Sequence, residues 1–262
     1  MLDKIILIHP TKCAGTAISE NLFKLKGFSD RKSAFLSGYT FNRLFQNNIQ
    51  VFYFIFHSKN VLLYLIYPLF YCVCLFSSLR NLLSNHKLGL TFSSGSIQHF
   101  TYREWKNINK IKEDSVCIGI VTHPQHRLVS SFYFLGYNKH YNFLEFLKAI
   151  QDGSLLSSIR FPGFRAIINQ HITSMYDTLI GFNDTDCINF LIKRESLDDD
   201  WKEFCALNNL KHNTLKHINK TKISTDWKNM YNRYPEAAQL VYKMYKKDFE
   251  HFGYKMCSNS NN

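Results

Sequence analysis

The chain has 262 residues, of which 45% are hydrophobic and 20% charged, so it can bury a sizeable core and form one large domain. This balance excludes a chain that is disordered throughout. The formal net charge of +12 favours an anionic partner such as a nucleotide, a nucleic acid, an acidic glycan or a membrane surface, although solubility alone also explains it. The seven cysteines show neither a disulfide framework nor zinc spacing, which predicts a reducing compartment and no metal.

The first predicted element is a buried parallel strand over Lys4 to Ile8. It begins so early that we expect neither a leader nor a membrane anchor before it. The stretch "TKCAGTAISENLFKLKG" then predicts a tight loop and a helix that Gly27 ends.

Residues 28–95 form an aromatic-rich insertion, for which we expect apolar helices. Its segment from Val61 to Leu79 is nearly long enough to span a bilayer, and Val51 to Phe56 adds a shorter apolar run. A single span would separate the opening loop from the rest of the chain. We therefore favour buried or membrane-surface helices over residues 51–79, with a spanning helix as the alternative.

Two further strands are predicted, at Ser115 to Pro124 and at Cys187 to Glu195. A helix begins near Gln125, and another follows the third strand. The stretch "PEAAQLVYKMYKKDFEHFGY", from Pro235 to Tyr254, predicts one amphipathic helix.

Strands that alternate with helices predict an α/β fold with an open parallel sheet flanked by helices. We expect a single domain over residues 1–257, which includes the insertion, and a disordered tail over residues 258–262.

The loop after the first strand is suited to binding phosphate. Backbone N–H groups at a helix N-terminus point at an anion there, and the helix dipole favours its charge. Lys12 adds a cation, Gly15 permits the turn, and Thr16 and Ser19 add hydroxyl donors. In nucleoside-triphosphate loops glycine directly precedes the lysine, whereas Lys12 comes before Gly15, which disfavours kinase or NTPase chemistry. An ordinary strand–turn–helix with a solvated lysine is the alternative.

Several stretches together resemble the carbohydrate sulfotransferase family. "IHPTKCAGTAIS" is similar to its P-K-x-G-G-T-S-like loop for the 5′-phosphosulfate, and "VTHPQHRLVSSFYF" to its R-D-P-x-x-R-x-x-S-x-Y signature for the 3′-phosphate. "INFLIKRESLDDDWKEFC", "LKHINKT" and "VYKMYKKDFEHFGY" are similar to later segments, in the family's order. The resemblance implies a P-loop NTPase-like fold and a bacterial-type member that uses 3′-phosphoadenosine 5′-phosphosulfate (PAPS) as donor, without a metal.

The resemblance assigns a role to each residue of the first loop. Lys12 would contact the phosphosulfate and stabilise charge on the bridging oxygen as the sulfuryl group leaves. The remaining donor-binding positions of this loop are Cys13, Ala14, Gly15, Thr16 and Ala17.

The second signature departs from the family pattern. Thr122 and His123 stand where the family usually has Arg and Asp, and that arginine is a main ligand of the 3′-phosphate. Arg127 and Ser130 match their positions, although a structural ion pair is the alternative for Arg127. A protonated His123, or Lys220 in "HINKT", would replace the missing arginine.

The general base is predicted from "SSGSIQHFTYREW", which is similar to the family's H-x-T-x-x-E segment. It identifies His99 as the base, with Glu104 either orienting it or belonging to the next helix. Gln170 and His171 resemble a position near the acceptor cleft, and Glu195 ends a strand at the expected active-site edge, where structural ion pairing is the alternative.

We therefore expect a sulfotransferase that acts on a carbohydrate hydroxyl, with an anionic glycan favoured by the basic charge. The expected location is the cytoplasm or the inner membrane. A non-catalytic relative that binds glycans or nucleotides is the alternative, supported by Thr122. A nucleic-acid-binding protein is disfavoured, because the aromatic residues lie in apolar runs rather than among Lys and Arg.

Overall fold

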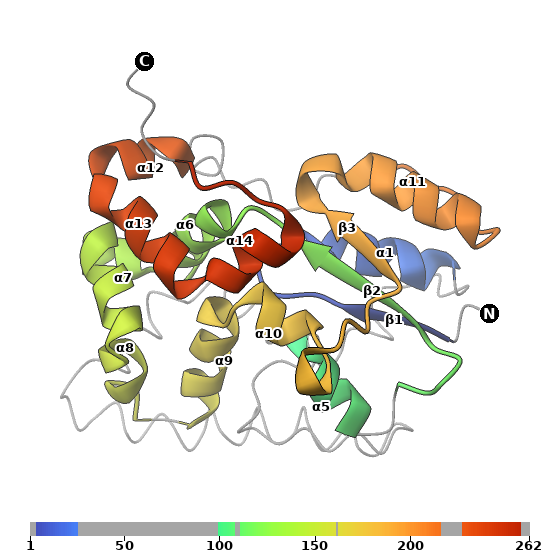
Figure 1. Ribbon diagram of the computed structural model, residues 1–262, viewed down its shortest axis with the longest axis horizontal. Coiled ribbons are helices and arrows are strands. Elements are labelled where there is room, and N and C mark those ends of the chain that lie inside the picture. The colour runs from blue at the N-terminus through green and yellow to red at the C-terminus, as the bar shows by residue number, and fades with distance from the viewer. Residues whose placement is uncertain (1–3, 26–98, 108–110, 161, 216–226, 258–262) are drawn as a thin grey trace.

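The computed structural model describes residues 4–25, 99–107, 111–160, 162–215 and 227–257. They form an α/β fold in which helices flank a three-stranded parallel sheet of order β1-β2-β3 (Figure 1). The predicted insertion, with its apolar residues 51–79, lies outside these ranges, as do Lys220 and the tail 258–262. No described helix has the length and apolar character needed to cross a bilayer.

The sheet consists of β1 (Ile5–Ile8), β2 (Val116–Val121) and β3 (Phe190–Lys193). Because both pairs are parallel, the carboxyl ends of all three strands meet at one edge, where an open α/β sheet binds its ligands. The apolar run of β2 suits its central position, since a parallel strand between two neighbours is covered on both faces. All three predicted strands are confirmed.

The helices fall into two groups. Those packed near the sheet are α1 (Gly15–Leu25), α5 (Tyr102–Asn107), α10 (Met175–Leu179) and α11 (Leu197–Leu207). Those around the second core are α6 (Pro124–Phe134), α7 (Phe143–Gln151), α8 (Ser154–Ser157), α9 (Pro162–Ile172), α12 (Trp227–Arg233), α13 (Pro235–Met244) and α14 (Lys246–Phe252). Figure 1 shows α7, α12 and α13 beyond the carboxyl end of β2.

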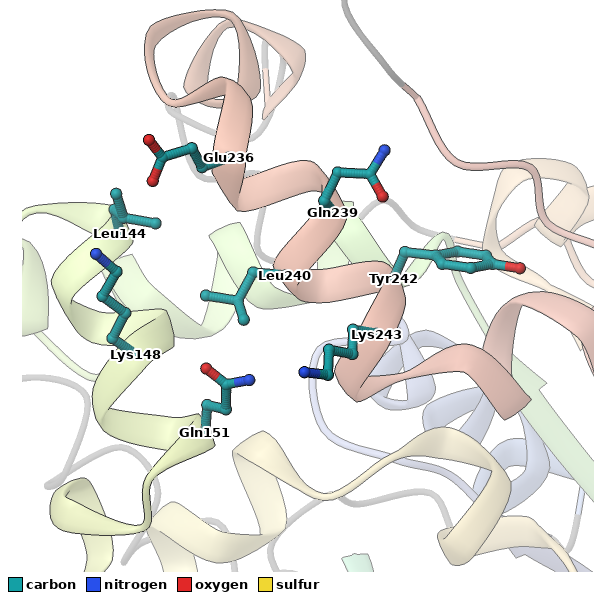
Figure 2. A pocket seen from close by; sticks show the side chains of 8 residues that line it. All are labelled: Leu144, Lys148, Gln151, Glu236, Gln239, Leu240, Tyr242 and Lys243. Carbon is teal, nitrogen blue, oxygen red and sulfur yellow. The ribbon is translucent and has the colours of Figure 1, made fainter.

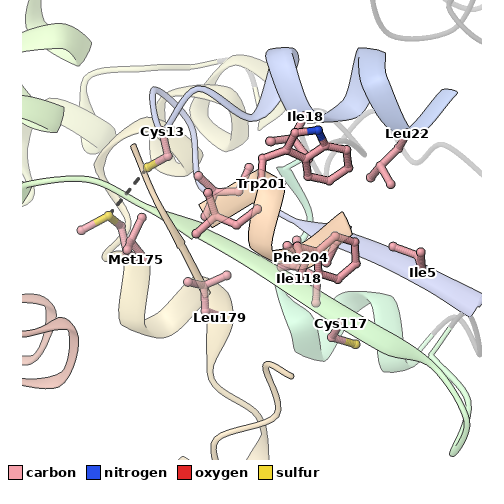
Figure 3. Close-up of a cluster of buried hydrophobic side chains, with 14 of the residues drawn as sticks. Ile5, Cys13, Ile18, Leu22, Cys117, Ile118, Met175, Leu179, Trp201 and Phe204 are labelled. Carbon is pink, nitrogen blue, oxygen red and sulfur yellow. Dashed lines mark hydrogen bonds between the residues drawn. The ribbon is translucent and has the colours of Figure 1, made fainter. Parts of the chain in front are cut away.

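The first core encloses the sheet. Figure 3 shows side chains of α1 and α11 on one side of β2 and those of α10 on the other. Trp201 and Phe204 are fully buried, and their rings stack with centroids 5.6 Å apart. On the other side, the Cys13 Sγ lies 3.7 Å from the Met175 Sδ, so the loop after β1 is packed directly against α10 (Figure 3).

The second core is aromatic and joins the helices beyond the sheet edge. The ring of Phe132 on α6 lies 5.3 Å from Phe143 and 5.1 Å from Phe146 of α7, measured between centroids. Such edge-to-face and tilted pairs stabilise a core beyond the area that they bury. This packing gives α6 a rigid outer support, while the opposite face of α6 is turned toward the strand ends.

The prediction of one helix from Pro235 to Tyr254 is wrong, because the chain breaks at Tyr245 (φ −118°, ψ 31°) into α13 and α14. Two tertiary contacts hold this break. The Tyr245 hydroxyl donates to the Ile172 carbonyl at 2.6 Å, and the buried Asp248 accepts from the N–H groups that begin α10. An amphipathic pattern does not reveal such contacts, so the sequence suggested a continuous helix.

Candidate functional site

The carboxyl ends of the three strands bring the two predicted phosphate signatures together, with Glu195 between them. Its Oε1 accepts from the Thr122 hydroxyl at 2.9 Å and from the His123 N–H at 2.8 Å, and its Oε2 accepts from the Tyr254 hydroxyl at 3.0 Å. Burial would raise the pKa of Glu195, but these hydrogen bonds outweigh it and the pKa is lowered. Glu195 is therefore ionised and has a structural role, since its two oxygens accept three hydrogen bonds from within the protein.

The loop after β1 has the backbone shape of an anion-binding turn. Lys12 (φ 66°) and Ala14 (φ 67°) both adopt the left-handed conformation that non-glycine residues rarely adopt. At Gly15, an added Cβ would lie 2.2 Å from Nδ1 of His9, so only glycine fits there. Because α1 begins at Gly15, the N–H groups of Gly15 and Thr16 have no partners within the helix, whereas that of Ala17 donates to the Ala14 carbonyl at 3.1 Å. The turn thus combines strained backbone with free donors, which is typical of a binding site.

The side chains of Cys13 and Ala17 anchor this loop to the core. Both are buried, and the Cys13 thiol contacts the Thr11 carbonyl at 3.5 Å. Burial raises the pKa of Cys13 to about 12, so the thiol is neutral. The side chains of these two residues pack the loop onto the core, and their predicted contact with the donor stays a prediction.

Lys12 carries the loop's charge. Its Nζ lies 4.0 Å from the centre of the Phe134 ring on α6, and in the described part of the chain it forms no ion pair with a carboxylate. Burial, followed by the charge of Arg194, lowers the pKa of Lys12 to about 8. A bound anion would oppose both effects, so the loop favours one.

One face of α6 is turned toward the loop. His126, Ser130 and Phe134 are spaced four residues apart and therefore lie on the same face. The Arg194 Nη1 lies 2.7 Å from Nδ1 of His126, while Lys12 lies over Phe134. The partly exposed Ser130 lies between these two positions along the helix, one turn from each.

Arg127, predicted as a phosphate ligand with a structural alternative, is fully buried and contacts backbone carbonyls. It donates to the carbonyls of Thr11 at 3.0 Å, Thr173 at 2.7 Å and Gln170 at 3.3 Å. Its guanidinium therefore joins the β1 loop to the end of α9. The structural interpretation describes these contacts better, although the partners are carbonyls and not a carboxylate.

His123 does not replace the missing arginine by becoming charged. Its Nε2 donates to the Lys255 carbonyl at 2.9 Å, and its ring packs against Trp227 with centroids 4.8 Å apart. Burial lowers its pKa, so the ring is neutral without a bound anion, and Nε2 is already engaged by the Lys255 carbonyl. Lys220, the other predicted replacement, lies outside the described residues.

His99, the predicted base, lies beside the β1 loop. Its Nδ1 is 3.2 Å from the His9 carbonyl, and because a carbonyl only accepts, Nδ1 carries the hydrogen. Nε2 then has a free lone pair. Burial and the neighbouring His9 and His171 lower the pKa of His99 well below its usual value, so it is neutral at pH 7.

The other residues near His99 have structural contacts. Glu104 accepts from the Thr101 N–H at 2.7 Å and so caps α5, which favours its second interpretation as part of the next helix. The ring of His171 stacks on Phe134 with centroids 5.0 Å apart and lies 6.3 Å from that of His99. Lys12 and His99 are thus linked through Phe134 and His171.

Arg194 is the residue that sequence reasoning missed. The available signal was a basic residue directly after the third strand, at the sheet edge where the two predicted phosphate signatures meet. The prediction named the neighbouring Glu195 at this edge but not Arg194.

A surface pocket of about 410 Å³ lies elsewhere, between α7 and α13 (Figure 2). It is lined by Leu144, Lys148, Gln151, Glu236, Gln239, Leu240, Tyr242 and Lys243. None of the predicted site residues is among them, and its charged side chains include both lysines and a glutamate. Within the described ranges, no group of three or more His, Cys, Asp or Glu residues could hold a metal ion.

Comparison with known proteins identifies one family. A family model described as "Sulfotransferase family" matches residues 3–255, which is nearly the whole chain. Neither the curated proteins nor the solved structures contain a significant match.

Proposed function

Because the chain belongs to the sulfotransferase family, which transfers sulfuryl groups, we propose that it moves a sulfuryl group from PAPS to a hydroxyl of a carbohydrate. The observation that carries this proposal is the β1 loop. Lys12, which forms no ion pair with a carboxylate in the described part of the chain, and the N–H groups of Gly15 and Thr16 at the start of α1 favour a phosphosulfate there.

In the proposed reaction, the acceptor oxygen attacks the sulfur and the bond from sulfur to the bridging phosphate oxygen breaks. Nε2 of His99 takes the acceptor proton, and the Lys12 ammonium stabilises the charge that forms on the bridging oxygen. The His9 carbonyl orients the base, so the loop that binds the donor also positions the group that activates the acceptor.

The composition of the chain bears on the acceptor class and the location. The net charge of +12 favours an anionic glycan, and a cytoplasmic or inner-membrane-associated location is proposed, the latter through apolar residues 51–79. The alternative function, a non-catalytic relative that binds glycans or nucleotides, is supported by Thr122 in place of arginine.

The test is calorimetric titration with adenosine 3′,5′-bisphosphate, the donor product. Lys12→Met keeps the contact with Phe134 and removes the charge, and should weaken binding about 10- to 100-fold, the range for a charged hydrogen bond. Lys148→Ala, an exposed lysine on α7, removes the same charge far from the loop and should leave binding unchanged.

Turnover is then measured as transfer of labelled sulfate from PAPS to neutral and anionic polysaccharides. His99→Asn should abolish transfer while it keeps the affinity for the bisphosphate. If the folded protein does not bind the bisphosphate, the enzyme proposal is wrong. Tight binding without transfer to any acceptor would favour the non-catalytic alternative.

A further inference from the structure

The family resemblance leaves a gap at Thr122, where the arginine for the 3′-phosphate is absent. The Thr122 side chain is fully buried, and its hydroxyl donates to Glu195 at 2.9 Å. The hydrogen of this hydroxyl is therefore used within the protein and is not available to a ligand. Arg127 is committed to backbone carbonyls, and His123 is uncharged and packed among aromatic rings. None of these three supplies a guanidinium to a ligand.

The sheet register places another arginine beside this gap. Val121 pairs with Lys193, so the next residues along the two parallel strands, Thr122 and Arg194, are neighbours at the sheet edge. The Arg194 Nη1 lies 2.7 Å from Nδ1 of His126, and that same nitrogen lies 3.3 Å from the Thr122 hydroxyl. The His126 ring therefore contacts both the Arg194 guanidinium and the Thr122 hydroxyl. The guanidinium comes from the end of β3, whereas the arginine of the family pattern would come from the end of β2.

Arg194 retains the capacity to bind an anion. Among the described residues its guanidinium forms no ion pair within 4 Å, although burial lowers its pKa and the nearby Glu195 carboxylate acts in the opposite direction. Its described hydrogen-bond contact is with the ring of His126, which leaves most of its five N–H donors available. Burial, and then the charge of Arg194, lowers the pKa of His126 to about 3, so this imidazole is neutral.

The position on α6 distinguishes the two phosphate groups. Arg194 contacts the helix at His126, one turn before Ser130, whereas Lys12 contacts it at Phe134, one turn after. Ser130 lies between them, and it is the residue that the resemblance assigns to the 3′-phosphate. Lys12 belongs to the loop assigned to the 5′-phosphosulfate. Arg194 is therefore the cation on the 3′ side.

Resting on the proposed function, we propose that Arg194 is the 3′-phosphate ligand of this chain and takes the place of the arginine that Thr122 lacks. The family pattern places this guanidinium at the end of β2, and in this chain it is at the end of β3. The planar fork of Arg194 binds the same phosphate from there. Selectivity for a 3′-phosphorylated donor is then retained despite the changed signature.

The experiment compares two nucleotides, adenosine 3′,5′-bisphosphate and adenosine 5′-monophosphate, by calorimetry on the full chain. Arg194→Met should weaken binding of the bisphosphate about 10- to 100-fold and change that of the monophosphate less than about 2-fold. Arg194→Lys should lose part of the affinity, since it keeps the charge but not the fork. Lys12→Met should weaken both nucleotides.

Matched controls separate this role from a general charge effect. Arg233→Met removes an exposed arginine at the end of α12 and should leave both affinities unchanged. Lys220→Met tests the replacement that the sequence suggested. Retained affinity for the monophosphate in Arg194→Met also shows that the site is still folded.

The outcomes distinguish the two proposals. If the wild type binds both nucleotides and Arg194→Met does not change their ratio, the role of Arg194 is wrong while the donor site stands. If only Lys220→Met removes the preference for the bisphosphate, Lys220 is the ligand and Arg194 is not. If the folded wild type binds neither nucleotide, both proposals are overturned.

Discussion

Buried histidines around the site should make the fold sensitive to mild acid, and three of them allow the size of the effect to be calculated. Burial lowers the pKa of His9 to about 4 and those of His126 and His171 to about 3. In the unfolded chain these side chains titrate near 6.5, the ordinary histidine value. Between these limits the unfolded chain binds protons that the native protein does not, so stability falls as the pH falls below about 6.5.

The size of the effect follows from these values. Lowering the pH from 7 to 5 should cost about 1.8 kcal/mol for each histidine, or about 5.5 kcal/mol for the three. Asp248 acts in the opposite direction, because burial raises its pKa to about 6 and the native protein then takes up a proton first. This offsets about 1.3 kcal/mol. The net loss of about 4 kcal/mol is a large part of the 5–15 kcal/mol that is typical of a domain.

The assay is urea unfolding at pH 7, 6 and 5, followed by tryptophan fluorescence, for which the fully buried Trp201 is a natural probe. His171→Asn provides the matched variant. Its amide can donate to the Ile167 carbonyl, as Nδ1 of the histidine does at 2.9 Å, but it does not titrate. The variant should lose about 2 kcal/mol less than the wild type between pH 7 and 5. Equal stability at the two pH values, or the same loss in both proteins, would refute the reasoning.

Two further substitutions test how the loop is held. Gly15→Ala should destabilise the protein by about 1–3 kcal/mol and weaken binding of the bisphosphate, because the new Cβ overlaps the His9 ring; unchanged affinity in calorimetry would contradict this. Arg127→Gln should cost about 2–4 kcal/mol in urea unfolding, since it leaves buried carbonyls of the loop without donors. A variant as stable as the wild type would instead return Arg127 to the role of a ligand.

Local patterns in the sequence were sufficient for the frame of the site. Apolar runs predicted all three strands, and their order with the intervening helices predicted a parallel sheet. The lysine and glycine after the first strand predicted a tight turn, which the left-handed Lys12 and Ala14 confirm, while its binding of an anion stays a prediction. These features depend on neighbours within a few residues, so the chain itself carries their signal.

The sequence did not predict the roles of the long polar side chains. Arg127 and Arg194 are equally basic in the sequence, yet one is buried against backbone carbonyls and the other contacts the ring of His126. Glu104 was a candidate to orient the base and caps a helix instead. In each case the partner lies on another element or in a local turn that the motif does not specify.

The sequence by itself therefore determined the strands, the turn and the family to which the segments belong. Only the tertiary structure decided the break at Tyr245 and which cation stands beside Thr122. The physical reason is that the register of β2 with β3 places residues 72 positions apart side by side, as the hydrogen bond from the His123 N–H to Glu195 also shows. No periodicity within either segment encodes that register.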